Sequence, residues 1–370
     1  MTSSSVDVQA PASDDAVPPP GQPRRRLRSR VGADATLIIA FAVVLLIVAI
    51  GALAVGRYTV PPNEIVRMLL GQVFPLQHTW YPQEESVVLD VRLPRVLLVI
   101  LVGAGLSLTG AVMQAVFRNP LASAQILGVS SGASFGGVLA LLFGLGSVAL
   151  VSGAFFGGIL ALVLVLAIAR AVPGAPLLMI ILGGTVVGAM FQAMVSFITY
   201  IADPSSELPS IVFWLMGSFA TASYSKILIA AVPIIPAAVV MLALRWRVNI
   251  LSMGDEDAIA IGLRPQRLRL VLLLCVALIT AGSVAVAGVV SWVGLVVPHL
   301  VRMIVGTDNR RVLPISALLG ATYLLVIDTL SRTINSAEIP IGILTAVIGA
   351  PFFIALLIKN RNRLWGSANA

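Results

Sequence analysis

The chain has 370 residues, of which 58% are hydrophobic and only 11% charged, and its mean hydropathy is +1.02. This is far more apolar surface than one soluble core could bury, so the composition predicts a polytopic, all-α membrane protein. The net charge of +8 does not indicate nucleic-acid binding, because the basic residues lie between apolar runs and are not gathered on one face. The single cysteine, Cys275, lies within an apolar run, which excludes a disulfide framework and a cysteine-based metal site.

The N-terminal region predicts a tail followed by a retained first helix. Residues 1–23 are rich in Ser, Asp, Ala and Pro, and a cluster of arginines follows before the first apolar run. Such a cluster can also mark a signal peptide, but the run over residues 35–55 is long enough to span a bilayer and lacks a convincing cleavage site. We therefore expect a disordered basic cytoplasmic tail over residues 1–34, a transmembrane domain over 35–363 and a cytoplasmic tail over 364–370.

The apolar runs predict about ten membrane-spanning helices, since a helix needs roughly 20 apolar residues to cross the hydrocarbon core. Residues 119–169 contain no Asp, Glu, Lys or Arg and are too many for one span, so this segment should fold back near Gly144. The run over residues 270–300 should divide near Gly288. The predicted spans cover residues 35–55, 93–116, 124–144, 147–169, 177–201, 227–244, 269–288, 290–305, 313–330 and 341–358.

The distribution of basic residues predicts the orientation of the chain. If the N-terminus is cytoplasmic, 18 of the 24 Lys and Arg residues fall in inside segments, whereas the 16 acidic residues divide equally. Orientation follows Lys and Arg and depends little on Asp and Glu. We therefore expect both termini in the cytoplasm.

Almost no ionisable residue lies within the predicted spans, where an ion-coupled carrier would need groups that change charge. Asp328 is the one acid in an apolar run, and His299 lies near an inner helix end. The chain has no glycine-rich loop ending in Lys-Ser or Lys-Thr, so ATP hydrolysis would have to come from a partner. The two scattered histidines supply neither an intramembrane catalytic site nor a metal site, so we predict no catalytic residue, no metal and no cofactor.

Blocks of motifs follow the spans in order. Their Gly, Ala and Ser residues let helix backbones approach where lipid provides no hydrophobic drive. The longest inner loop, residues 245–269, is polar but regular enough to form two short helices around Gly254 and Gly262. The blocks cover residues 91–95, 103–105, 110–114, 118–122, 127–133, 249–258, 261–269, 294–302, 306–314, 328–332, 338–342 and 349–353.

These blocks resemble the permeases of iron-siderophore, haem and vitamin B12 ABC importers, and the resemblance covers residues 36–363. It implies a transport subunit, not an enzyme, in the bacterial inner membrane. The subunit would pass an iron chelate, with a ferric siderophore as the closest match, from an extracytoplasmic binding protein to the cytoplasm. The implied partners are cytoplasmic ABC ATPase subunits, the binding protein, a second permease copy and the lipid bilayer. Haem and cobalamin stay open as cargo, as does a pair of related rather than identical permeases.

The resemblance also implies three groups of site residues. In the family, the 245–269 loop docks into the ATPase, which here assigns coupling to Leu251, Ser252, Gly254, Asp255, Glu256, Ala258, Gly262 and Leu263. The outside arginines Arg92, Arg95 and Arg332 match positions that meet acidic residues of the binding protein, although they could instead anchor the outer interface. The fifth span should line the pathway between two copies with Gly183, Gly184, Thr185, Gly188, Gln192, Met194, Ser196 and Thr199. A short outer helix is expected within residues 203–225.

A secondary transporter or channel that works without ATP is the rival from a different class. The scarcity of charge within the spans counts against it.

Overall fold

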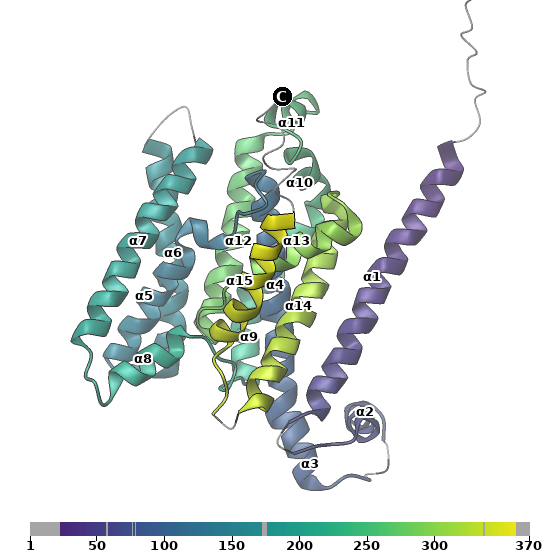
Figure 1. Ribbon diagram of the computed structural model, residues 1–370, viewed down its shortest axis with the longest axis vertical. Helices are drawn as coiled ribbons and strands as arrows, with labels where there is room; N and C mark the ends of the chain where they lie inside the picture. Colours follow the sequence, from purple (N-terminus) through teal and green to yellow (C-terminus); the bar gives the residue numbers. More distant parts are fainter. Residues whose placement is uncertain are drawn as a thin grey trace, which may run out of the picture.

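The computed structural model describes residues 23–56, 58–75, 77, 79–171, 176–335 and 337–359. Within this part of the chain all regular structure is helical, as predicted (Figure 1). Seven helices are long and apolar enough to cross a membrane. They are α1 (Pro23–Ala54), α4 (Leu93–Val116), α6 (Gly146–Ala171), α7 (Pro176–Ile201), α9 (Tyr224–Ala243), α12 (Pro265–Ala287) and α14 (Asn309–Ile334). Three apolar helices are shorter: α5 (Val129–Leu142), α13 (Val293–Val305) and α15 (Ile341–Lys359).

Each of the ten predicted spans coincides with one of these apolar helices. The predicted divisions are confirmed, because α5 ends before Gly144 and α12 ends before Gly288. The number of membrane crossings and the cytoplasmic position of the termini stay predictions. Helix α1 begins at Pro23, upstream of the span boundary predicted at residue 35, whereas the remainder of the predicted N-terminal tail and the whole C-terminal tail lie outside the described residues.

One predicted span is not a single helix. Residues 124–144 form a short 3-10 helix, η2 (Ala124–Leu127), and then α5, with Gly128 between them at φ +68°. A side chain at Gly128 would be strained in this left-handed conformation and would also press on Gly184 and Gly188 of α7. The break therefore lets α5 begin inside the protein, against the middle of α7.

Glycine contacts hold the helices at close range. A Cβ atom at Gly132 or Gly136 of α5 would overlap a carbonyl oxygen of α6, at Gly157 or Gly153 respectively. In the same way, a Cβ at Gly110 of α4 would overlap the Gly294 carbonyl of α13. Such contacts gain van der Waals packing where lipid gives no hydrophobic drive. Helices α4 and α12 are the most buried of the long apolar helices.

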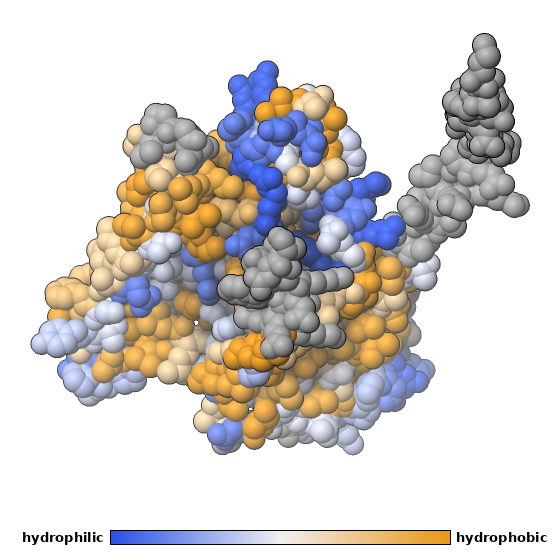
Figure 2. All heavy atoms as spheres, turned by 45° about the horizontal axis from the view of Figure 1, so that its top comes forward, coloured by the Kyte–Doolittle hydropathy of each residue, from blue (hydrophilic) through white to orange (hydrophobic). Residues whose placement is uncertain are grey.

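Short helices occupy the two ends of the bundle (Figure 1). At one end lie α10 (Arg245–Leu251) and α11 (Asp255–Ala260), as expected for the 245–269 loop. At the other end lie α2 (Pro62–Gly71), α3 (Pro82–Ser86), which continues through the π-helix η1 (Val87–Arg92) into α4, and α8 (Glu207–Leu215), the helix expected within residues 203–225. Hydrophilic residues gather over the α10–α11 end, and the flank of the bundle is largely hydrophobic (Figure 2).

Candidate functional site

The segment α10–α11 is a compact unit on the polar end of the bundle. Leu251 at the end of α10 and Ala258 in α11 are fully buried and fix the two helices to the bundle. Helix α11 ends at Ala260, and Gly262 just after it has a φ of +79°, the left-handed conformation that glycine adopts without strain. This turn lets the Leu263 N–H bond to the carbonyl of Ala258 at 2.9 Å. Ser252 accepts a hydrogen bond from the Nδ2 of Asn309, which ties α10 to the start of α14.

An ion pair anchors α11 to the core. Nη1 of Arg269, on α12, lies 2.8 Å from Oδ2 of Asp255, and Nη2 of Arg118 lies 3.6 Å from its Oδ1. The hydrogen bond from Arg269, together with the charges of both arginines, lowers the pKa of Asp255 against the effect of burial. Asp255 is therefore engaged within the chain, whereas its predicted companion Glu256 is exposed.

Sequence reasoning missed the apolar part of this surface. Met253, Ile259 and Ile261 are 66%, 59% and 53% exposed around α11. Together with Gly254 and Glu256 they form a mixed surface, which we call the α11 surface. Apolar residues within a charged loop are a weak signal in the sequence, because periodicity over six residues cannot distinguish an exposed position from a buried one.

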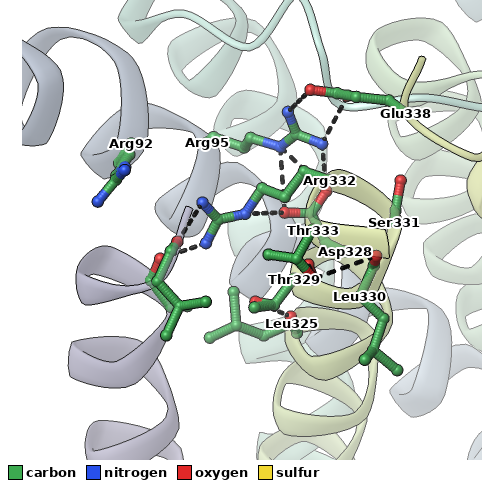
Figure 3. A network of polar contacts seen from close by, with 12 residues as sticks. Arg92, Arg95, Leu325, Asp328, Thr329, Leu330, Ser331, Arg332, Thr333 and Glu338 are labelled. Atoms are coloured by element: carbon green, nitrogen blue, oxygen red, sulfur yellow. Dashed lines mark hydrogen bonds and ion pairs between the residues drawn. The ribbon is translucent and has the colours of Figure 1, made fainter. Parts of the chain in front are cut away.

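At the opposite end, Arg95 bridges two carboxylates (Figure 3). Its Nη2 lies 2.8 Å from Oδ1 of Asp328, on α14, and its Nη1 lies 3.0 Å from Oε1 of Glu338. The side chain of Asp328 is 1% exposed and that of Glu338 is 29% exposed. Arg95 thus joins α4 to α14 and to the connection that leads to α15.

The other two predicted docking arginines bind the C-terminal end of α1. Arg92 donates to the carbonyl of Leu53 at 2.6 Å, and Arg332 donates to those of Val55, at 2.8 Å, and Ala52. The last carbonyls of a helix have no partner within the helix, and cations are favoured beside them. Both guanidinium groups therefore cap α1.

The structure thus places Arg92, Arg95 and Arg332 at the same end of the bundle. It also buries them, since the residues are 6%, 9% and 9% exposed. Their binding-protein contact stays a prediction. Their partners within the chain, above all Asp328 and Glu338, could not be recognised from the sequence, where they lie more than 200 residues from Arg95.

Helix α7 divides the predicted pathway residues into two groups. Thr185, Gln192 and Ser196 are exposed and recur at intervals that place them on one face of the helix. Gly183 and Gly184 are buried instead, with Gly184 packed on the backbone of η2. Of the remaining predicted residues, Met194 is exposed, whereas Gly188 and Thr199 are partly buried. The exposed face of α7 thus carries these polar residues next to Leu182 and Val186, and it is the part of the helix that a second chain or a cargo could contact.

Known proteins resemble the chain over most of its length. The model of the FecCD transport family matches residues 43–359. The molybdate import system permease protein MolB of Haemophilus influenzae is 41% identical over 323 residues, which are 87% of this chain and 95% of the relative. A probable iron chelatin transport system permease protein of Helicobacter pylori is 41% identical over 275 residues, 74% of this chain and 83% of the relative.

A solved structure has the same fold. It is that of a metal-chelate type ABC transporter in an inward-facing conformation, with a TM-score of 0.78 and 40% sequence identity, and the match covers 88% of this chain and 99% of that one. The helices described above and these relatives make the chain a multi-pass permease of the inner membrane. It belongs to the FecCD transport family.

Proposed function

We propose that this permease imports its cargo with energy from a separate cytoplasmic ATPase, which binds the α11 surface. The proposal is supported by the ion pair that joins the α11 surface to the core of the bundle. Exposed Met253, Ile259 and Ile261 offer apolar contacts to a partner, and the Asp255–Arg269 pair joins α11 to α12. Because α12 is mostly buried, a displacement of α11 would be carried into the packed centre of the bundle.

A second copy of the chain is proposed to complete the pathway. The face of α7 that carries Thr185, Gln192 and Ser196 has no partner helix among the described residues, and it presents these polar side chains beside the exposed apolar side chains of Leu182 and Val186. Two such faces across a two-fold axis would form a weakly polar conduit. The permease would then depend on the binding protein for most of its selectivity.

Docking of the binding protein is proposed at the outer end, centred on Arg95. Arg92 and Arg332 are occupied by carbonyls of α1, so they would support the docking surface and not touch the partner. Arg95 is different because one of its two carboxylates, Glu338, is partly exposed. An acidic side chain of the partner could replace Glu338 there and steer the encounter.

The proposed cargo is an iron chelate, with a ferric siderophore first and haem or cobalamin as alternatives. A second candidate is molybdate, because a 41% identical relative that matches 87% of this chain is a molybdate permease. These cargoes differ greatly in size and charge, so direct uptake measurements separate them.

The test is reconstitution in vesicles with a cognate ATPase and binding protein. Uptake of ferric siderophore, haem, cobalamin and molybdate is measured with trapped ATP and with an ion gradient alone. We expect uptake only with ATP and ATPase, and its loss in Met253→Asp together with loss of ATPase association. Tyr81→Asp, at an equally exposed site of the opposite end, is the matched control and should retain both. Uphill uptake driven by an ion gradient without the ATPase would refute the proposal.

A further inference from the structure

A cavity of about 640 Å³ lies beside α10, where several of the motif blocks come together. Its walls are the end of α4 with the turn at residues 118–120, α10 itself, and the end of α13 with the turn into α14. These segments are far apart in sequence, and the cavity collects polar side chains from each of them.

Arg302 gives the cavity a positive charge without a counter-ion in the chain. It is partly buried at the end of α13, and it donates hydrogen bonds to Oε1 of Gln114 and to the carbonyl of Ala111. Both partners are neutral, and the ion pairs found among the described residues do not include Arg302. A cation that has lost part of its water without gaining an anion is unfavourable, so this position favours an anionic ligand.

Further donors line the same cavity. Arg118 adds a second guanidinium, whose side chain is 45% exposed and only loosely paired with Asp255, at 3.6 Å. Asn119 and Asn249 both use Oδ1 as an acceptor for a backbone N–H, at 2.9 and 2.8 Å. The Nδ2 group of each side chain is therefore available to donate a hydrogen bond to a ligand. Guanidinium and amide N–H groups are the donors that phosphate oxygens prefer.

The acceptors in the cavity are fewer. Asp308 is the one carboxylate among the lining residues, and its Oδ1 accepts from the backbone N–H of Arg310, which caps α14. Asn309 is 2% exposed and its Oδ1 is buried without a partner. A protonated phosphate oxygen, or a water bound to it, could donate to that atom. With the neighbouring Asp255 and its partner Arg269 included, three guanidinium groups against two carboxylates leave a net positive site.

We propose that this cavity binds a phosphate group, carried either by a soluble ion or nucleotide or by the head group of a lipid. Arg302 and Arg118 would hold the phosphate oxygens, with Asn119 and Asn249 as amide donors. The site borders the α11 surface, with which it shares Met253, but its binding can be measured without an ATPase, a binding protein or cargo. Failure of this proposal would therefore leave the transport proposal untouched, and the reverse also holds.

The test uses the full chain, purified in dodecyl maltoside, which contains no phosphate. One arm titrates inorganic phosphate and ADP calorimetrically. The other arm uses native mass spectrometry to compare retention of phosphatidylglycerol with that of diacylglycerol, which lacks the phosphate. Arg302→Gln and Asn119→Asp are the test variants, and Arg267→Gln is the matched control because Arg267 is exposed and lies outside the cavity.

We expect the wild type to bind in at least one arm, and the responding arm identifies the source of the phosphate. Each test variant should weaken that binding by about tenfold or more, the value of a charge-assisted hydrogen bond, while Arg267→Gln stays within about twofold. Asn119→Asp keeps the Oδ1 bond to Leu121 and so decides the outcome if Arg302→Gln does not fold. Absence of wild-type binding in both arms, or an equal loss in Arg267→Gln, would overturn the proposal.

Discussion

Arg95 on α4 and Asp328 on α14 are 233 residues apart in the chain, and their side chains meet at 2.8 Å in a buried ion pair. The pair is completed by Glu338, which reaches the same guanidinium from the connection before α15. Arg332, whose Nε lies 3.8 Å from Oδ2 of Asp328, supplies the second positive charge, so two arginines balance two carboxylates within a single chain.

Removing the acid from that pair should destabilise the protein. Asp328→Asn leaves Arg95 with Glu338 alone, so we expect a loss toward the lower end of about 3–5 kcal/mol, the cost of breaking a buried pair. The midpoint of thermal unfolding in detergent measures the change. Asp90→Asn removes the same charge from an exposed position and should shift the midpoint little, and an equal shift in both variants would contradict the buried pair.

Glu338→Gln should behave differently from Asp328→Asn. The carboxylate of Glu338 is partly exposed, so its loss should cost about 1 kcal/mol or less. It should at the same time make Arg95 more reactive toward phenylglyoxal, an arginine reagent, as measured by peptide mapping. No change in the reactivity of Arg95 would mean that Glu338 does not shield it.

Arg332→Lys should loosen the end of α1. A lysine ammonium lacks the planar fork with which Arg332 reaches the carbonyls of Ala52 and Val55 together. We expect faster proteolysis of the segment between α1 and α2, although the charge is unchanged. Arg67→Lys, at a side chain that is 55% exposed, is the matched control, and equal rates in the two variants would exclude a capping role.

Gly110→Ala should be severely destabilising. Its Cβ would overlap the carbonyl of Gly294, so α4 and α13 would have to separate, at a cost of about 1–3 kcal/mol or more. Gly51→Ala on α1 makes the same chemical change where no atom lies within 4 Å, and it should be tolerated. Yield of folded protein and unfolding midpoint report both changes, and similar values would show that the α4–α13 contact is adaptable.

The pair between Asp255 and Arg269 should resist moderate acid. Because its hydrogen bond with Arg269 lowers the pKa of Asp255 below 3.8, the stabilisation is complete above that value and is lost only as the pH falls through the lowered pKa. The difference in unfolding midpoint between the wild type and Asp255→Asn should therefore stay constant from about pH 5 to about pH 8. A difference in unfolding midpoint that declines already at about pH 6 would contradict a lowered pKa of Asp255.

Hydropathy and turn residues were sufficient to predict where the apolar helices lie, because the length of a span and the folding back at Gly144 are local properties. The break at Gly128 was not predicted, since it depends on the approach of α7 from more than 50 residues away. The arginines show the same limit. Their position at the end of the bundle opposite α10 and α11 followed from the order of the spans, but the partners of Arg92 and Arg332 are backbone carbonyls, which leave no mark in a sequence. The α11 surface likewise required the fold, because exposure of Ile259 cannot be read from six residues.

The two guanidinium caps have a consequence for α1. Most of the surface of this helix is exposed. Leu37, Phe41 and Leu45 pack on the core from one face, while the guanidinium contacts lie at the C-terminal end (Figure 1). Hydrocarbon tails thus surround most of α1, while Arg92 and Arg332 fix its C-terminal end. A thinner or thicker bilayer should therefore change the tilt of α1 about its C-terminal end more than the packing of the buried helices α4 and α12.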